Sequence, residues 1–334
     1  MKNILLINRS TKRSRSLIIP AEDQTSAPPT SARPGGRARG DVGLHNQKNS
    51  VNSVVNSVCV GTGIPAILVH GLAASLHDWD MLLPELAAHG YAGYALDLLG
   101  HGESAKPSRL GDYTSDSVFV HLGEWIDALR LDEPAILVGH SLGGYLSLRY
   151  ALEYPERVRA LVLVNPFFTL SQLPPALRFF LRRPLFNTSL IERTPYWLFR
   201  IIIDATSLQF GHSTEKLHSL PVGVRVQTAL DYKRAAPGIY NIPRTLNDLT
   251  ADLPRVTQPA LVIWGARDQT IDPKTFPMLL QKLPHARGEV MPVCGHVPHQ
   301  CHAREFNEKV FKFLNSLQGV RNNFDIPHIQ DLAG

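Results

Sequence analysis

A serine lies between two glycines in the run Gly139-His140-Ser141-Leu142-Gly143, which has the spacing G-x-S-x-G. The apolar residues 135–138 before it predict a buried strand, and the apolar spacing of residues 145–152 after it predicts a helix. A sharp turn from strand to helix crowds the residues on either side of the serine, and glycines remove that collision. The serine hydroxyl is then exposed at the tip of a sheet, where it can act as a nucleophile. The five residues alone also fit a tight turn without chemistry.

A serine hydroxyl needs a base within hydrogen-bond reach, and an imidazole held by a carboxylate suits that task at neutral pH. Farther along the chain, Asp268 and His296 each follow a short apolar run. The order is therefore serine, acid, histidine, with each residue just beyond a predicted strand. This pattern predicts Ser141 as the nucleophile, His296 as the base and Asp268 as the acid. Asp272 is an alternative acid, less favoured because Asp268 directly follows its strand.

Short apolar runs alternate with helix-like segments through most of the chain. The strand-like runs are residues 54–60, 66–70, 92–97, 135–138, 159–164, 260–264 and 288–293, and the helix-like segments include 79–89, 114–129 and 306–317. Such alternation is typical of parallel β-α units, so it predicts an α/β fold with a doubly wound, mostly parallel sheet. Ligands bind beyond the carboxyl ends of the strands in such sheets. We therefore expect Ser141, Asp268 and His296 to meet at one rim.

The alternation stops over residues 167–250, which are rich in aromatic residues, arginine and proline. An insertion between two strands that end beside the serine predicts a helical lid, or cap, over the nucleophile. Phe167, Phe179 and Trp197 within it form the predicted substrate pocket, although ordinary core packing would also explain these aromatics. Basic residues border the apolar helical segments of this insertion, so peripheral contact with a membrane surface is a further alternative.

The two ends of the chain differ in composition from the body. Residues 1–50 contain nine Lys and Arg against three Asp and Glu, whereas the rest of the chain contains 25 against 26. This basic, Pro- and Gly-rich stretch predicts a disordered tail. We expect residues 319–334 to form a loose C-terminal tail and residues 51–166 and 251–318 to form the core. Because the positive charge lies in the tail, the body does not favour nucleic acid as a partner.

No uncharged apolar run approaches the roughly 18 residues that span a bilayer, and three cysteines give no disulfide framework. These features predict a cytoplasmic protein without a transmembrane segment, with organelle targeting by the basic tail as an alternative. The cysteines and histidines from Cys294 to His302 have a spacing that fits none of the usual zinc patterns, so we expect neither a metal nor a cofactor. The sequence carries no signal for the oligomeric state.

In combination, several motifs resemble the α/β-hydrolase superfamily, specifically its capped serine esterase- and lipase-like members. They are His70-Gly71, Asp97 with Gly100-His101-Gly102-Glu103-Ser104, the Gly139–Gly143 elbow, Gly265-Ala266-Arg267-Asp268 and Gly295-His296. The resemblance covers residues 54–318 and implies the same three catalytic residues. It also implies an oxyanion hole made by the backbone amides of Leu72 and Leu142. Dehalogenases and epoxide hydrolases of this fold use aspartate at the elbow, so Ser141 argues against both.

The sequence therefore predicts a serine hydrolase whose partner is a small-molecule carboxylic ester with an apolar acyl or alcohol part. Thioesterase, amidase and C–C bond hydrolase activities are alternatives on the same triad. The stretch Leu72-Ala73-Ala74-Ser75 lacks the longer glycine-rich run usual in C–C hydrolases, which disfavours that alternative. A non-catalytic ligand receptor on the same fold is an alternative of another class, but a receptor need not keep a nucleophile, an acid and a base together.

Overall fold

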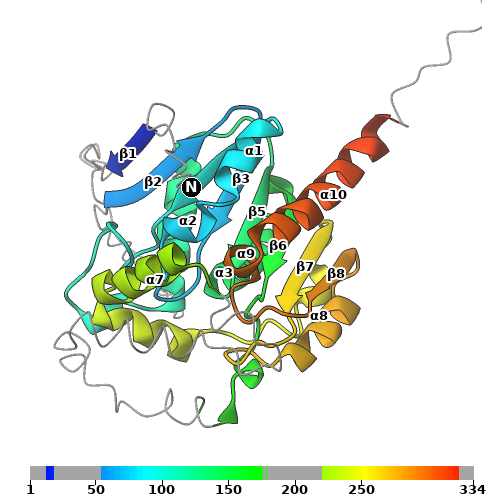
Figure 1. Ribbon diagram of the computed structural model, residues 1–334. Coiled ribbons are helices and arrows are strands. Elements are labelled where there is room, and N and C mark those ends of the chain that lie inside the picture. The colour runs from blue at the N-terminus through cyan, green and yellow to red at the C-terminus, as the bar shows by residue number, and fades with distance from the viewer. Residues whose placement is uncertain (1–12, 19–53, 176–177, 179–219, 323–334) are drawn as a thin grey trace, which may run out of the picture.

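Aliphatic runs form the strands of a sheet that crosses the middle of the molecule (Figure 1). The computed structural model describes residues 13–18, 54–175, 178 and 220–322. Within these residues the sheet has eight strands in the order β1-β2-β4-β3-β5-β6-β7-β8. They are β1 (Arg13–Ile18), β2 (Val54–Val60), β3 (Ile64–Val69), β4 (Tyr91–Leu96), β5 (Ala135–His140), β6 (Val158–Val164), β7 (Ala260–Gly265) and β8 (Ala286–Met291). Only the two described pairings that involve β2 are antiparallel, which confirms the predicted α/β, mostly parallel sheet.

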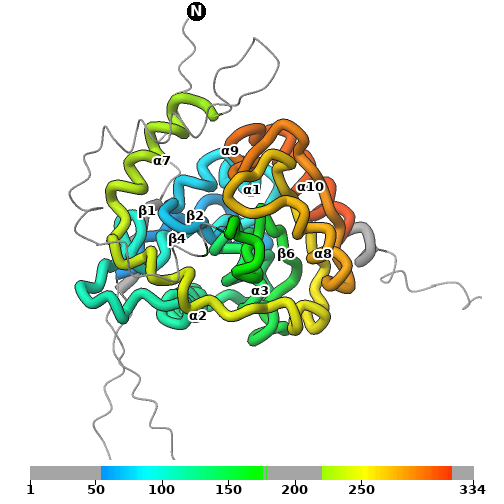
Figure 2. Tube along the Cα trace, turned by 90° about the horizontal axis from the view of Figure 1, so that it is seen from below, coloured from blue at the N-terminus to red at the C-terminus, as the bar shows by residue number. Residues whose placement is uncertain are grey.

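Successive side chains of a strand point to opposite faces, so each face of the sheet carries its own apolar layer. In β5, Leu137 packs into one layer and Val138 into the other. The first layer is covered by α2 (Ser115–Leu129), α3 (Leu142–Glu153) and α8 (Phe276–Lys282). The second layer is covered by α1 (Leu83–Ala88) and α10 (Ala303–Asn322). Figure 2 shows α1 and α10 on the opposite side of the strands from α2 and α3, as expected for a doubly wound sheet.

One part of the basic N-terminal stretch departs from the expected disorder. Residues Arg13–Ile18 form β1, which pairs antiparallel with β2 from Arg13 opposite Cys59 to Ile18 opposite Val54. The prediction of disorder considered only how little apolar surface this segment can bury by itself. An edge strand also gains main-chain hydrogen bonds from its neighbour, and composition does not report that gain. The other residues of the 1–50 segment lie outside the described residues.

Two helices differ from the predicted ranges. The expected helix over 79–89 is divided: Trp79 ends the short 3-10 helix η2 (Leu76–Trp79), and α1 begins only at Leu83. Pro84 lies in the first turn of α1, where its missing N–H costs nothing. The closing helix α10 continues to Asn322, so the first residues of the expected loose C-terminal tail are helical. A glycine such as Gly319 costs a helix only about 1 kcal/mol, so it does not have to end one.

The insertion after β6 is described at its two ends. They include α7 (Val222–Arg234) and two 3-10 helices, η5 (Leu170–Gln172) and η6 (Pro237–Thr245). The ends meet, because the Leu249 amide donates to the Phe168 carbonyl at 3.0 Å. Figure 1 shows α7 near the end of the sheet to which the β7 arrow points. Residues 179–219 lie outside the described residues, so the lid as a whole stays a prediction.

Candidate active site

Ser141 occupies a strained turn between β5 and α3. Its backbone has φ 51° and ψ −110°, in a region that non-glycine residues rarely adopt. Glycine is needed at positions 139 and 143 because a side chain at either one would collide with a neighbouring main-chain oxygen. A Cβ on Gly139 would lie 2.4 Å from the Gly143 carbonyl oxygen, and one on Gly143 would lie 2.0 Å from the Val69 carbonyl oxygen. The serine is half-buried at the carboxyl end of β5, as the G-x-S-x-G spacing predicts.

Asp268 and His296 form a hydrogen-bonded pair beyond the ends of β7 and β8. The His296 Nδ1–H donates to Asp268 Oδ2 at 2.7 Å. The Asp268 side chain is fully buried, whereas that of His296 is 21% exposed. This arrangement leaves Nε2 of His296 as the acceptor nitrogen of a neutral ring, which is the state a general base requires.

Asp268 is held as a carboxylate by a ring of donors. Its Oδ1 accepts from the amides of Thr270 (2.7 Å) and Ile271 (3.0 Å), and its Oδ2 also accepts from Asn165 Nδ2 at 2.5 Å. Burial by itself raises the pKa of Asp268, but His296 and the two amides outweigh it and hold the pKa below its usual value. The alternative acid, Asp272, is exposed and accepts from the Lys274 amide at the start of a 3-10 helix. The geometry therefore favours Asp268 as the acid.

Contacts with the His140 side chain bring His296 close to the serine turn. The carbonyl oxygen of His296 is 3.0 Å from Nε2 of His140, the residue before Ser141, and the two histidine ring centroids are 4.9 Å apart. Among the described residues the Ser141 hydroxyl has no hydrogen-bond partner. In ligand-free sites the contact between nucleophile and base is often long and tightens when substrate binds.

The two amides predicted for the oxyanion hole belong to different segments, the start of α3 and the loop after β3. Leu142 is the first residue of α3, so its N–H has no acceptor within the helix. Leu72 lies in the loop after β3, and a Cβ on the preceding Gly71 would lie 3.4 Å from Ser141 Cβ. His70 fixes this loop: its Nδ1–H donates to the Gly71 carbonyl at 2.7 Å, and its Nε2 accepts from the Leu98 amide at 3.0 Å. Burial lowers the pKa of His70, which keeps this ring neutral.

The predicted substrate pocket is described at one residue only. Phe167 is 5% exposed and belongs to the apolar layer that contains α3, and its amide donates to the Ser141 carbonyl at 3.0 Å. It therefore lies next to the nucleophile, mostly within the core. Phe179 and Trp197 lie outside the described residues, so their place in the pocket stays a prediction.

Two polar residues at the rim were not assigned a role from sequence. Asn165 follows β6 with φ 41° and donates to Asp268, and its only sequence signal is its position at a strand end. Asp78 is 6% exposed and lies 3.1 Å (Oδ2) from Nδ1 of His140. No motif around Asp78 indicates that contact. By contrast, Asp97 has a structural role, because it accepts from the amides of Leu76 and Glu103, each at 2.8 Å.

The cysteine- and histidine-rich run from Cys294 to His302 separates into different surroundings. Cys294, Cys301 and His302 have their sulfur and nitrogen atoms within 4.8 Å of one another, a spacing that a soft metal ion tolerates. The Cys301 thiol, followed by burial, raises the pKa of Cys294, which opposes metal binding because the ligand is a thiolate. His299 instead lies near Asp78 and His140. The expectation of no metal stays a prediction.

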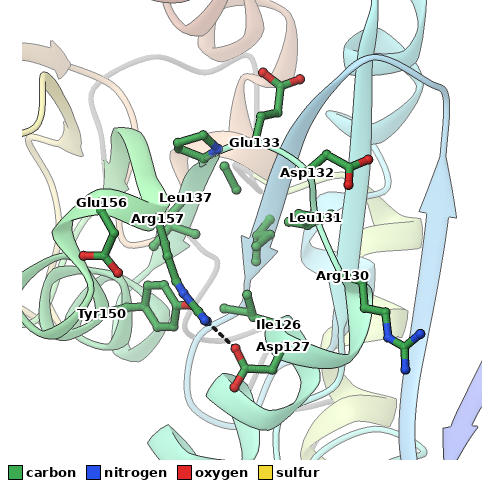
Figure 3. Close-up of a pocket in the computed structure, with 13 residues that line it drawn as sticks. Ile126, Asp127, Arg130, Leu131, Asp132, Glu133, Leu137, Tyr150, Glu156 and Arg157 are labelled. Carbon is green, nitrogen blue, oxygen red and sulfur yellow. Dashed lines mark hydrogen bonds and ion pairs between the residues drawn. The ribbon is translucent and has the colours of Figure 1, made fainter.

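Two cavities lie away from the serine. One of about 280 Å³ opens at the start of β5, where Arg157 pairs with Asp127 beside Tyr150 (Figure 3). The other, of about 550 Å³, lies between residues 106–113 and 233–238. Ser141 lines neither cavity. The described residues contain no helix that is long and apolar enough to cross a bilayer.

Comparisons with known proteins agree with this fold. A family model described as alpha/beta hydrolase fold matches residues 65–300. The chain is 27% identical over 266 residues to 2-hydroxy-6-oxo-6-(2'-aminophenyl)hexa-2,4-dienoic acid hydrolase of Metapseudomonas resinovorans, covering 76% of this chain and 85% of that protein. It is also 27% identical over 239 residues to Lipase 3 of Moraxella sp. (strain TA144), covering 71% of this chain and 73% of that protein.

A solved structure of a thermophilic esterase from Thermogutta terrifontis has a TM-score of 0.66 at 24% identity, and the match covers 79% of this chain and 94% of that one. This likeness concerns the fold. The family model spans the sheet from β3 to β8, the serine turn and His296. The chain therefore belongs to the α/β-hydrolase fold family, and it is a hydrolase with esterase- and lipase-like relatives.

Proposed function

We propose that this enzyme cleaves a carboxylic ester with an apolar acyl or alcohol part, using Ser141, His296 and Asp268. The observation that carries the proposal is the buried Asp268 carboxylate, 2.7 Å from His296 Nδ1, at the rim where the strained Ser141 turn lies. A carboxylate in this position fixes the imidazole tautomer and stabilises the imidazolium that forms during reaction.

The reaction then has two halves. Ser141 Oγ attacks the ester carbonyl carbon while His296 Nε2 accepts the hydroxyl proton, and the backbone amides of Leu72 and Leu142 hold the negative oxygen. When the tetrahedral intermediate collapses, the alcohol leaves with the proton from His296. Water attacks the acyl enzyme next, again giving its proton to Nε2, and collapse releases the carboxylic acid and restores Ser141.

An apolar acyl or alcohol part is supported by Phe167, which is buried in the apolar layer and whose amide donates to the carbonyl of Ser141. C–C bond hydrolysis is the second candidate, on the similarity to the hexadienoic acid hydrolase over 85% of that protein's length. Thioester and amide substrates would use the same residues. A cytoplasmic location and peripheral membrane contact remain predictions from composition.

Trapping of the acyl enzyme tests the proposal. After mixing with p-nitrophenyl acetate and rapid acid quench, the proposal expects a p-nitrophenol burst and one acetyl group on the peptide that contains Ser141. The Ser141→Ala variant supplies the control and should show neither. A folded wild-type protein that gives no acyl adduct with p-nitrophenyl acetate, butyrate or octanoate would favour the receptor alternative.

A further inference from the structure

A second polar group lies behind His296. We call it the Asp78 cluster, and its four side chains are Asp78, His140, His299 and Gln300. Asp78 belongs to η2, His140 ends β5, and the other two belong to the short helix α9 (Pro298–Cys301). The side chains of Asp78, His140 and His299 are only 7%, 5% and 1% exposed. The steps proposed above use none of these four side chains.

Every oxygen of Asp78 faces a donor. Oδ1 accepts from Gln300 Nε2 at 2.9 Å, and Oδ2 accepts from His140 Nδ1 at 3.1 Å and from the Gly71 amide at 3.4 Å. The other ring nitrogen of His140, Nε2, lies 3.0 Å from the carbonyl oxygen of His296. A carboxylate and a carbonyl can only accept. An imidazole donates from both nitrogens only as the doubly protonated imidazolium.

The negative charge of Asp78 is directed at His140 and not at His299. His299 Nε2 is 3.9 Å from Asp78 Oδ2, beyond hydrogen-bond distance, and its ring packs against Trp79 with centroids 4.9 Å apart. Burial lowers the pKa of His299 to about 3, so this ring is neutral. Burial by itself raises the pKa of Asp78, but the His140 hydrogen bond and the histidine rings around it hold the pKa below its usual range.

The other titratable groups that face His140 are histidines, and none of them adds a negative charge to the cluster. They are His70, which burial keeps neutral, and the rings of His296 and His299, with centroids 4.9 and 4.6 Å from that of His140. His296 is neutral whenever it acts as a base. A single buried pair, the Asp78 carboxylate and the His140 ring, therefore accounts for the charge of the cluster.

We infer that Asp78 holds His140 as an imidazolium, which positions His296 by donating a hydrogen bond to its main-chain carbonyl. The inference rests on the proposed function, because it assigns His296 the role of base. Asp268 holds the His296 ring from Nδ1, and His140 holds the main chain of the same residue. His140 also precedes Ser141, so it ties the main chain of the base to the turn that carries the nucleophile.

Two substitutions of His140 separate the contact with His296 from the contact with Asp78. The amide nitrogen of His140→Gln reaches the place of Nε2, so this variant keeps a donor for the His296 carbonyl. The amide of His140→Asn reaches the place of Nδ1, so it keeps only a partner for Asp78. Both variants remove the charge. We expect kcat within about threefold of wild type for His140→Gln and a loss of about tenfold to a hundredfold for His140→Asn, with KM unchanged in both.

The matched control is His121→Gln. His121 is 3% exposed on α2, and neither of its ring nitrogens has a hydrogen-bond partner among the described residues. Loss of a buried histidine as such should therefore lower stability there without changing kcat. Equal kcat in the His140→Gln and His140→Asn variants would overturn the positioning role.

Nuclear magnetic resonance of protein labelled with ¹⁵N-histidine tests the cluster without turnover. The expected result at pH 7.5 is two protonated ring nitrogens on His140, and one after Asp78→Asn. The Nδ1 proton of His296, hydrogen-bonded to Asp268, should remain in His140→Gln and disappear or shift in His140→Asn. A singly protonated His140 in the wild type, or an unchanged His296 proton in both variants, would overturn the inference. Absent esterase activity with these signals intact would instead count against the proposed function alone.

Discussion

Replacing Asp268 by asparagine should remove activity through the tautomer of His296. The new amide nitrogen would occupy the place of Oδ2, which now accepts from His296 Nδ1 at 2.7 Å and from Asn165 Nδ2 at 2.5 Å. An amide N–H facing Nδ1 favours the ring with its proton on Nε2, which cannot accept the Ser141 proton. In a triad this tautomer change costs about 10⁴ in kcat, and we expect a loss of that size in kcat/KM.

The same substitution should lower stability for a separate reason. Two amide donors, from residues 165 and 268, would face each other in a fully buried place, and a buried donor without an acceptor costs about 1–3 kcal/mol. Such a cost lowers Tm by roughly 3–10 °C in a domain of this size. Asn165→Asp in the same chain gives the new amide a carboxylate acceptor. The double variant should therefore regain Tm but not activity, because a neutral amide still faces His296.

The assay is a kcat/KM series on p-nitrophenyl butyrate with thermal melts of the same samples. Asp272→Asn is the control: Asp272 caps a 3-10 helix at the surface, asparagine caps equally well, and activity should stay within about twofold of wild type. Wild-type kcat/KM in Asp268→Asn, or recovery of activity in the double variant, would refute the assignment of Asp268 as the acid.

Three further predictions concern stability, specificity and metal content. Burial raises the pKa of Asp231 to about 7 despite the hydrogen bond from Gln227. The folded protein therefore holds that proton more tightly than the unfolded chain does. The stability that the protonated acid contributes is lost as pH rises from about 4 through about 7. Asp231→Asn should thus raise Tm by several degrees at pH 8 and leave it unchanged at pH 4, whereas an equal shift at both values would contradict the assignment. Polar substitutions at Phe179 or Trp197 should change the acyl-chain preference among p-nitrophenyl esters more than Tm; an unchanged preference in stable variants would place the pocket elsewhere. Treatment with EDTA should leave activity unchanged, and activity lost to EDTA and restored by zinc would revive a metal site in the Cys294–His302 run.

The sheet and the three proposed catalytic residues could be predicted because their signals are local. Each strand is a short aliphatic run, and Ser141, Asp268 and His296 each follow one, so topology alone brings them to one rim. The contacts of Asn165 and Asp78 could not be predicted in this way, because they join residues 103 and 62 positions apart. Nothing in the neighbouring residues of either one reports its partner.

The β1 strand was missed for a related reason. Its stability depends on the free edge of β2, and a composition argument considers the segment alone. The start of α1 was missed because the apolar periodicity of the sequence includes Trp79, whereas the α-helix begins only at Leu83, with Pro84 in its first turn. Hydrogen bonds to a distant strand therefore decided the fold of residues 13–18, and a proline marked the start of α1.

Covalent labelling of Ser141 is the measurement that tests the central claim most directly. A fluorophosphonate phosphonylates a serine that a base has activated, with loss of fluoride, and peptide mapping identifies the labelled residue. The structure predicts one label, on Ser141, which is lost in Ser141→Ala and much slower in Asp268→Asn, with the fold intact by thermal melt. Folded wild-type protein that takes no label, or takes it on a different serine, would contradict the assignment of this chain as a Ser141 hydrolase.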